Sequence, residues 1–427
     1  MPFDATSGAP QRIAIIGGGI SGLASAWLLS RHHQVTLFEA ARRPGGHART
    51  VVAGQHGDQP VDTGFIVFNH VNYPHLTGMF RDLDVPIIKS DMSFGVSLEG
   101  GRIEYALRSA NALFAQRRNM FDPGFYAMIR DILRFNTTVE TVLETAPEAS
   151  IADLIEQMGL GSRFREHYLF PFCAAIWSTP ERDIAAFPAR ALVRFMRNHG
   201  LMSRSEHHQW WTVEGGSISY VTRLYMALAN ARVDLRMGAE VVAVTRTDGA
   251  ISLRVAGAEA ETFDHVVLAT HADQALAMLS DASPEEQAAL SAIRFQPNRA
   301  VLHADPRVMP RRKLCWSSWV SHSNVEHGDV GVSYWMNRLQ NIPESDPLFV
   351  TLNPACEIDP RLIYDEKVFR HPLFDRAAIA AQGRLAAQQG KRNTWFAGAW
   401  LRNGFHEDGF ASAMRIARRL SPASVLP

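Results

Sequence analysis

The sequence has 427 residues, of which 46% are apolar and 20% charged, and its formal net charge is zero. This balance is typical of a globular protein of roughly two or three domains. A net charge of zero does not favour nucleic-acid binding, because the phosphates demand a clustered basic surface. The three cysteines are widely spaced, so we expect neither a disulfide framework nor a metal site. The sequence has no apolar run of about eighteen residues and no recognisable signal peptide, which predicts a cytoplasmic protein.

The N-terminal part of the chain predicts a parallel sheet. Residues 12–17 are typical of a short buried strand, residues 22–31 of a helix and residues 35–39 of a second strand. A strand, a helix and another strand in this order form a right-handed crossover unit. We therefore expect an α/β fold that begins with a dinucleotide-binding motif.

A glycine-rich turn separates the first strand from the helix and satisfies the pattern GxGxxG. Gly17 permits the tight turn, Gly19 lets the backbone approach a pyrophosphate, and Gly22 allows close packing of helix on strand. Glu39 ends the second strand, where a carboxylate accepts hydrogen bonds from ribose hydroxyls. The candidate cofactor-binding residues here are Gly17, Gly19, Ser21, Gly22, Glu39 and Ala40. This motif by itself does not separate FAD from NAD.

The next segment indicates FAD. Residues 43–50 read Arg-Pro-Gly-Gly-His-Ala-Arg-Thr and resemble the RxGG[R/H]xxT element of the flavin amine oxidase and phytoene desaturase superfamily. Paired glycines let such a loop pass close to a pyrophosphate, and the cationic groups suit its charge. Residues 61–65, 238–241 and 395–412 resemble further flavin-contacting elements of this superfamily. In the last of these, the resemblance implies a helix that starts at Gly409 and points its first N–H groups at the flavin ring. The resemblance places at the cofactor Arg43, Gly45, Gly46, His47, Thr63, Gly64, Phe65, Val241, Gly398, Asp408, Gly409 and Phe410.

The remainder of the chain alternates between helical and strand patterns. Residues 73–200 predict a largely helical region rich in aromatic side chains. Residues 233–246 and 251–257 predict strands that flank a hairpin turn at Asp248-Gly249. Strands follow at residues 263–270 and 394–400, and a closing helix at residues 409–420.

These patterns and the resemblance together imply a mixed α/β architecture. It combines a discontinuous, Rossmann-like FAD-binding domain of glutathione-reductase type with an inserted substrate domain of helices and sheet. We expect the FAD-binding domain to comprise residues 1–72, 206–284 and 391–427, and the substrate domain residues 73–205 and 285–390.

Four short segments narrow the resemblance. VDTGFIVFN (61–69), WSTP (177–180), FAGAW (396–400) and GFHEDGFAS (404–412) are similar to a bacterial group of FAD-binding proteins associated with cyclopropane-fatty-acid-synthase-type methyltransferases. That group includes the flavin desaturase of furan fatty acid formation. The resemblance implies an FAD-dependent oxidoreductase acting on a lipid-like substrate, such as a modified fatty acyl chain, with a methyltransferase as a partner.

Two alternatives stay open at this stage. An amine oxidase would need an aromatic cage beside the flavin, for which Trp400 and Phe65 are candidates. A flavin-holding subunit without activity would serve a partner methyltransferase. In either enzyme, His406 is a candidate base for C–H abstraction, although it could equally be a structural hydrogen-bond donor.

One segment also suggests peripheral contact with a membrane. Residues 108–134 carry five arginines among aromatic and aliphatic residues. Such a mixture suits an anionic lipid surface, and a solvated helix face is the alternative. The arginines are Arg108, Arg117, Arg118, Arg130 and Arg134.

Overall fold

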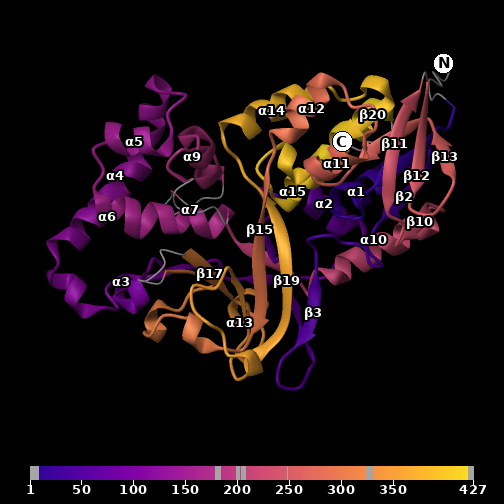
Figure 1. The fold of residues 1–427 in the computed structure, drawn as a ribbon. Helices are drawn as coiled ribbons and strands as arrows, with labels where there is room; N and C mark the ends of the chain where they lie inside the picture. Colours follow the sequence, from indigo (N-terminus) through magenta and orange to yellow (C-terminus); the bar gives the residue numbers. More distant parts are fainter. Residues whose placement is uncertain are drawn as a thin grey trace, which may run out of the picture.

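The structure is a computed structural model that describes residues 9–177, 184–198, 202, 208–247, 249–323 and 330–421. Figure 1 shows one part that contains α1 (Ile20–Leu29), β2 (Gln34–Glu39) and β10 (Asp234–Met237), and a second part that contains α4 (Pro123–Thr145), α7 (Phe170–Trp177) and β17 (Val330–Trp335). The long strands β15 (Phe295–His303) and β19 (Ile363–Pro372) run between them. Segments from both ends of the chain contribute to the first part.

A five-stranded parallel sheet forms the centre of the first part, with strand order β10-β2-β1-β14-β20. Its strands are β1 (Arg12–Ile16), β2 (Gln34–Glu39), β10 (Asp234–Met237), β14 (His265–Leu268) and β20 (Thr394–Phe396). Each neighbouring pair is parallel, which confirms the predicted α/β class. The strands that the sequence predicted at residues 263–270 and 394–400 are both shorter in the structure.

A three-stranded antiparallel sheet lies next to this one and comprises β11 (Val241–Thr247), β12 (Ala250–Val255) and β13 (Ala260–Phe263). The predicted hairpin is present, because Thr247 pairs with Ala250 across the turn; Asp248 itself lies outside the described residues. The predicted strand at residues 233–246 is two strands of different sheets. Gly238, with a φ of 71°, ends one and redirects the chain into the next.

The third large sheet has seven strands in the order β19-β15-β18-β17-β16-β7-β8. They are β7 (Phe94–Leu98), β8 (Ile103–Ala106), β15 (Phe295–His303), β16 (Trp319–Ser323), β17 (Val330–Trp335), β18 (Phe349–Leu352) and β19 (Ile363–Pro372). Two smaller sheets comprise β3 (Thr50–Ala53) with β4 (Gln59–Asp62), and β5 (Val67–Phe68) with β9 (Trp210–Val213) and β6 (Ile87–Ser90).

The prediction of a largely helical region at residues 73–200 is therefore wrong for residues 87–106. Strands β6, β7 and β8 lie there. Gly100 and Gly101, with φ values of 64° and 88°, make the turn that pairs β7 with β8. The parallel pairing of β7 with β16 joins segments more than 200 residues apart, and such a long-range partner leaves no local signal.

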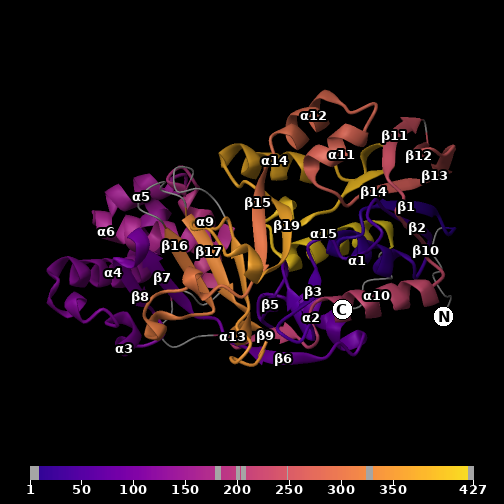
Figure 2. The ribbon, with the colours of Figure 1, turned by 60° about the horizontal axis from the view of Figure 1, so that its bottom comes forward.

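The helices surround these sheets (Figures 1 and 2). They are α1 (Ile20–Leu29), α2 (Pro74–Asp82), α3 (Ala110–Leu113), α4 (Pro123–Thr145), α5 (Ile151–Gln157), α6 (Ser162–Phe164), α7 (Phe170–Trp177), α9 (Ala189–Asn198), α10 (Ile218–Asn230), α11 (Ala272–Met278), α12 (Pro284–Ser291), α13 (Met336–Leu339), α14 (Arg376–Ala386) and α15 (His406–Leu420). Sequence signals set several starts. Ser150 and Ser283, for example, form capping boxes with the acidic residue three positions later.

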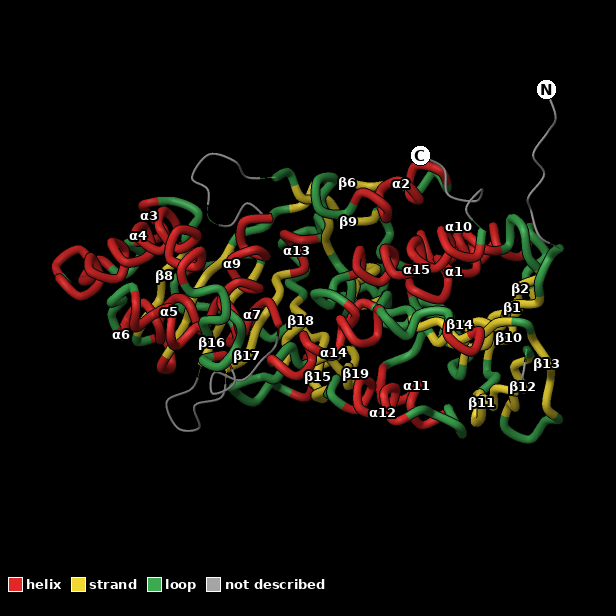
Figure 3. Tube along the Cα trace, turned by 90° about the horizontal axis from the view of Figure 1, so that it is seen from above, coloured by secondary structure: helices red, strands yellow, loops and turns green. Residues whose placement is uncertain are grey.

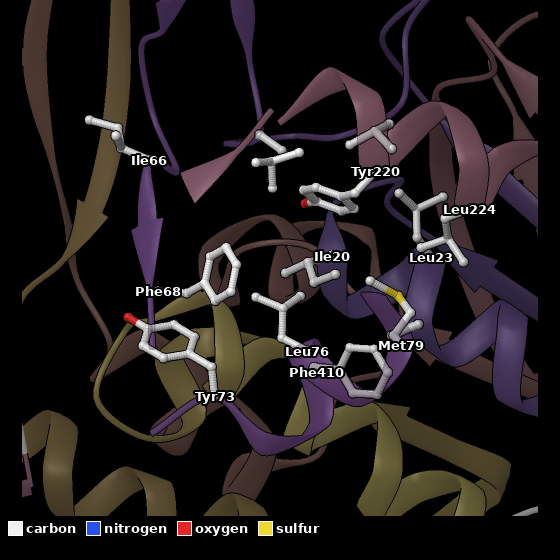
Figure 4. Packing of buried hydrophobic residues seen from close by; sticks show 14 of the residues in the cluster. Ile20, Leu23, Ile66, Phe68, Tyr73, Leu76, Met79, Tyr220, Leu224 and Phe410 are labelled. Carbon is white, nitrogen blue, oxygen red and sulfur yellow. The ribbon is translucent and has the colours of Figure 1, made fainter. Parts of the chain in front are cut away.

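The two ends of the chain meet where α15 packs along α1 (Figure 3). The Phe410 ring, with 1% of its surface exposed, makes an edge contact with Trp27 at 6.3 Å between centroids. Figure 4 shows Phe410 in one apolar cluster with Ile20, Leu76 and Met79. This packing positions the start of α15 beside the glycine-rich turn.

One exposed helical glycine offers a simple test of the fold. Gly383 lies inside α14, and a Cβ built there meets no atom within 4 Å. Alanine restricts the unfolded chain more than glycine does, so Gly383→Ala should raise the free energy of unfolding by about 0.5–1 kcal/mol. Urea unfolding with saturating FAD would measure it. An unchanged or lower value would mean that α14 is not a regular helix at this position.

Candidate functional site

A cavity of about 790 Å³ opens at the carboxyl ends of the parallel strands. Residues within two positions of the carboxyl ends of β1, β2, β14 and β20 line it, among them Gly17, Glu39, Thr270 and Gly398. Ligands of open α/β sheets bind at this edge because the loops and helix N-termini converge there.

At one end of the cavity two glycine-rich loops lie against each other. The Gly45 N–H donates to the Gly18 carbonyl at 2.7 Å, and Gly19 and Gly45 form a parallel bridge. A Cβ built on Gly19 meets no protein atom within 4 Å, although the residue lines the cavity. The backbone is thus open to a ligand at the N-terminus of α1, where a diphosphate fits.

Gly22 is needed for a different reason. A Cβ at this position would lie 1.7 Å from the Gly17 carbonyl oxygen, so helix α1 can approach β1 only with glycine here. Gly22 therefore allows the close packing of α1 against the turn, and it does not line the cavity.

Glu39 is held in place by the backbone of the two loops. Its Oε2 accepts a hydrogen bond from the Gly18 N–H at 2.6 Å and its Oε1 one from the Ala41 N–H at 2.7 Å. Each carboxylate oxygen keeps a lone-pair site, and the side chain lines the cavity. These free sites fit the two hydroxyls of an adenosine ribose.

Further along, neutral histidines form part of the cavity wall. His47 lies 5.8 Å from His271 and 5.6 Å from His371 between ring centroids. Burial lowers the pKa of His271 to about 4 and that of His371 to about 3; it also lowers the pKa of His47. The Nδ1 of His271 is buried and has no hydrogen-bond partner among the described residues, which leaves it available to a polar ligand atom.

His406 opens α15 and contacts two aromatic side chains. Its imidazole stacks on Phe65 at 4.0 Å with an angle of 11° between planes, and its Nε2 lies 2.5 Å from the Tyr220 hydroxyl. Burial raises the pKa of Tyr220, so the phenol is the donor. Nε2 therefore accepts, and the proton of His406 sits on Nδ1. Burial lowers the pKa of His406 to about 3, which keeps the ring neutral.

Most of the residues predicted for the site come together in this cavity. Those that line it are Gly17, Gly19, Ser21, Glu39, Ala40, Gly45, Gly46, His47, Thr63, Gly64, Phe65, Val241, Gly398 and His406. Arg43 does not line it. Its guanidinium donates to the carbonyls of Pro44, Gly46 and Ala48 and so shapes the loop.

The predicted start of the last helix is wrong. Helix α15 begins at His406, three residues before Gly409, because the Asp408 carboxylate accepts the Phe405 N–H at 3.0 Å and caps the helix there. The Gly409 N–H donates to the Phe405 carbonyl inside the helix. Neither Asp408, Gly409 nor Phe410 lines the cavity. The N–H groups without an intrahelical acceptor are those of His406 and Glu407.

Two groups of cavity residues were missed from sequence. Thr270 and His271 follow β14. A signal existed, since a strand was predicted at residues 263–270, and the carboxyl end of a strand in a parallel sheet lies at the ligand-binding edge. Phe369 and His371 come from β19 of the seven-stranded sheet. No local pattern in the sequence indicates that this strand reaches the cavity.

The sequence model of the flavin-containing amine oxidoreductases matches residues 20–343. This match covers most of the chain, including the Gly45-Gly46 loop and the helix that follows the first glycine-rich turn. The chain belongs to the flavin-containing amine oxidoreductase family. The members of this family are flavin-containing oxidoreductases, and FAD is the cofactor for which the open Gly19 backbone and the oriented Glu39 carboxylate are suited.

The curated proteins that are similar to this chain include a desaturase and amino-acid oxidases. Hydroxyneurosporene desaturase of Rubrivivax gelatinosus is 28% identical over 292 residues, covering 60% of this chain and 53% of that protein. The L-amino-acid oxidase BjussuLAAO-I of Bothrops jararacussu is 46% identical over 46 residues, covering 10% of this chain and 9% of that protein. The chain thus spans about half or less of the length of these curated relatives.

The fold extends further than the sequence similarity. The CLA-producing fatty acid isomerase from P. acnes superposes with a TM-score of 0.66 at 15% identity, covering 96% of this chain and 98% of that one. This likeness confirms the mixed α/β flavoprotein fold. Among the described residues no helix is long and apolar enough to cross a membrane.

Proposed function

We propose that the protein is an FAD-dependent desaturase or dehydrogenase that removes two hydrogens from an apolar, lipid-like substrate, such as a modified fatty acyl chain. FAD supplies the two-electron acceptor for this chemistry. The observation that carries the proposal is the composition of the cavity wall on the side of the seven-stranded sheet.

That wall, which we name the aromatic chamber, is built from β7, α7, α9, β16, β17 and β18. Its residues are Phe94, Phe172, Ala175, Ile176, Phe195, Trp319, Tyr334, Val350 and Leu352. Among the described cavity residues the carboxylates are Glu39 and Glu240, and both lie at the opposite end, beside β2 and β11. A charged ammonium substrate would be costly to bury in such a chamber, whereas an acyl chain gains about 0.8 kcal/mol for each buried CH₂ group.

The chain's own groups have three roles in this proposal. The aromatic chamber excludes water and holds the apolar chain. Tyr220 and Phe65 fix the His406 imidazole in one orientation. Neutral His406 is the candidate acceptor of the proton that leaves the substrate, once its Nε2 lone pair is released from the Tyr220 hydroxyl. Its pKa of about 3 makes it a weak base.

Replacing His406 tests this last role. We expect His406→Ala to keep FAD bound and to slow anaerobic substrate-driven flavin reduction by roughly 10²-fold, the lower end of general-base effects, because so weak a base provides little driving force. Tyr220→Phe is the matched variant, since it removes the hydroxyl and keeps the ring; it should leave the rate within roughly tenfold. If His406→Ala reduces at the wild-type rate with full FAD occupancy, His406 takes no part in proton transfer.

Comparative lipid mass spectrometry tests the proposed substrate class. Cells that contain the protein should accumulate lipids two hydrogens lighter than those of cells without it. Cells with a variant that cannot bind FAD are the control, and their lipids should match those of cells without the protein. Identical lipid profiles in all three would contradict a lipid substrate.

Two other functions remain as weaker candidates. An amine oxidase is supported by the similarity to L-amino-acid oxidases, but Phe65 stacks on His406, and the Trp400 indole donates to the Thr270 carbonyl at 3.0 Å. A flavin-holding partner of a lipid methyltransferase is supported only by the sequence resemblance. It would show no flavin reduction by any lipid unless the methyltransferase were added.

A further inference from the structure

We propose that the protein docks on the surface of an anionic lipid bilayer through the turn before α4 and the first turns of that helix. This surface, named here the arginine–aromatic surface, comprises the exposed side chains of residues 107–134. It lies on α3 and α4, at the end of the molecule far from β10 to β13 (Figures 1 and 2). The inference goes beyond the proposed function and does not depend on it.

The surface exposes large apolar side chains that the fold does not need. Phe121 is 87% exposed, Tyr126 48% and Met120 47%, and Leu107 and Leu133 are also exposed. Together they make up five of the fourteen exposed large apolar side chains of the described residues, within a stretch of 27 positions. Phe121, Met120 and Tyr126 border one surface hollow with Arg130. Apolar groups gathered in this way mark an interaction site rather than a solvated helix face.

Three arginines of this segment donate to neutral acceptors, whereas Arg130 lies 3.3 Å from the Asp131 carboxylate. Arg117 donates to the Phe114 carbonyl and the Asn111 amide oxygen, and Arg108 donates to the Leu314 carbonyl. These acceptors are neutral, so the positive charges remain uncancelled. Arg118 likewise donates to the Arg102 carbonyl.

The carboxylates of the same segment already have internal partners. Asp122 accepts from Arg163 at 2.6 Å. Just before the segment, buried Glu104 accepts from Arg312 at 2.8 Å. Buried Asp131 accepts the Gly161 N–H at 3.0 Å. In a chain of zero net charge, this segment therefore presents a local excess of cations beside exposed aromatic rings.

The surface is also preformed. Asp122 caps α4 by accepting the Gly124 N–H at 2.9 Å, and the Tyr126 hydroxyl donates to the Met120 carbonyl at 3.1 Å. The protruding Phe121 side chain is thus held on a fixed backbone. Aromatic side chains that insert at the headgroup level, ringed by arginines that attract acidic headgroups, complement an anionic bilayer.

Vesicle co-sedimentation tests the proposal with the FAD-loaded protein. Wild type should bind vesicles of phosphatidylglycerol and phosphatidylcholine, and should bind pure phosphatidylcholine at least roughly tenfold less. The double variant Arg117→Gln/Arg118→Gln and the single variant Phe121→Ser should each lower binding to the mixed vesicles by roughly tenfold. High salt should weaken the wild type more than the arginine double variant.

Matched controls come from other exposed positions. Met226 on α10 is 61% exposed, and Arg384 is exposed on α14. Met226→Ser and Arg384→Gln should bind vesicles as the wild type does, which would support the proposal. Absent binding to the anionic vesicles, or equal losses in the controls, would overturn it. So would a change of Phe121→Ser from dimer to monomer on light scattering with vesicle binding unaltered, since the surface would then hold a second copy of the chain.

Discussion

Replacing Gly19 with leucine is expected to abolish FAD binding while leaving the fold intact. A Cβ at this position meets no protein atom within 4 Å, and the residue has an ordinary φ of −76°. The leucine side chain would therefore extend into the cavity, where the FAD diphosphate approaches the backbone. The apoprotein has no reason to change, whereas FAD affinity should fall at least roughly 100-fold, since the added atoms would occupy the space of the ligand.

Gly22→Ala is the matched comparison within the same motif. Its Cβ would lie 1.7 Å from the Gly17 carbonyl oxygen, so this variant should fail to fold. Circular dichroism would report folding, and the flavin released on denaturation would report FAD content. If Gly19→Leu retained full FAD, the diphosphate would lie elsewhere. If both variants lost structure alike, Gly19 would be a packing residue only.

Mild acid is expected to destabilise the protein strongly. Burial holds the pKa of five histidines at about 3 to 4, far below the value of about 6.5 in an unfolded chain. They are His271, His303, His322, His371 and His406. A lowered pKa means that the folded state prefers the neutral ring. The stability is therefore complete above about pH 6.5 and is lost as the pH falls toward the folded values.

The size of the loss follows from the same relation. At about pH 5.5 each of these imidazoles is protonated in the unfolded chain and neutral in the folded protein. This difference lowers the free energy of unfolding by roughly 1.4 kcal/mol for each ring, or by about 7 kcal/mol for the five. Two buried carboxyls oppose this. Burial raises the pKa of Glu407 to about 7 and that of Asp62 to about 6. As the pH falls to about 5.5, both carboxyls therefore become protonated in the folded protein, which raises the free energy of unfolding by about 2–3 kcal/mol. The net loss is about 4 kcal/mol, a large part of an ordinary domain's stability.

Urea unfolding at about pH 7.5 and about pH 5.5, with and without FAD, would measure this loss. His322 provides a control because it lies in the seven-stranded sheet, where its Nε2 contacts the Ser333 hydroxyl at 3.0 Å, and it does not line the cavity. His322→Gln removes one titrating ring, so its acid-induced loss should be smaller by roughly 1.4 kcal/mol. Equal stability at both pH values would show that these rings protonate in the folded state.

The cofactor end of the site could be predicted from sequence because its chemistry depends on local backbone. A GxGxxG turn demands glycine at Gly17, Gly19 and Gly22 for reasons that lie within six residues, and Glu39 ends the strand that follows. The structure brings the Gly45-Gly46 loop directly against this turn. Each of these positions carries a sequence signal that is independent of the rest of the fold.

The other end of the site could not be predicted in the same way. The aromatic chamber combines Phe94, Phe172 and Tyr334, which come from segments far apart in the chain. The parallel pairing of β7 with β16 and the antiparallel pairing of β16 with β17 place Phe94 and Tyr334 in one sheet, and α7 packs on this sheet. The sequence prediction misplaced the start of α15, because the start depends on which acidic side chain accepts the N–H groups ahead of the helix. Asp408 caps the helix, while Glu407 accepts the N–H groups of His75 and Leu76 at the start of α2.

Anaerobic mixing of the purified yellow protein with phospholipids, free fatty acids and amines tests the central claim most directly, because flavin absorbance reports substrate oxidation in a single turnover. The apolar chamber predicts that a lipid, and no amine, bleaches the flavin, and that Gly19→Leu shows no signal. Slow bleaching by NADPH is also expected, since the sequence carries no second GxGxxG motif. Rapid bleaching by an amine, with none by any lipid, would contradict the account and identify an amine oxidase.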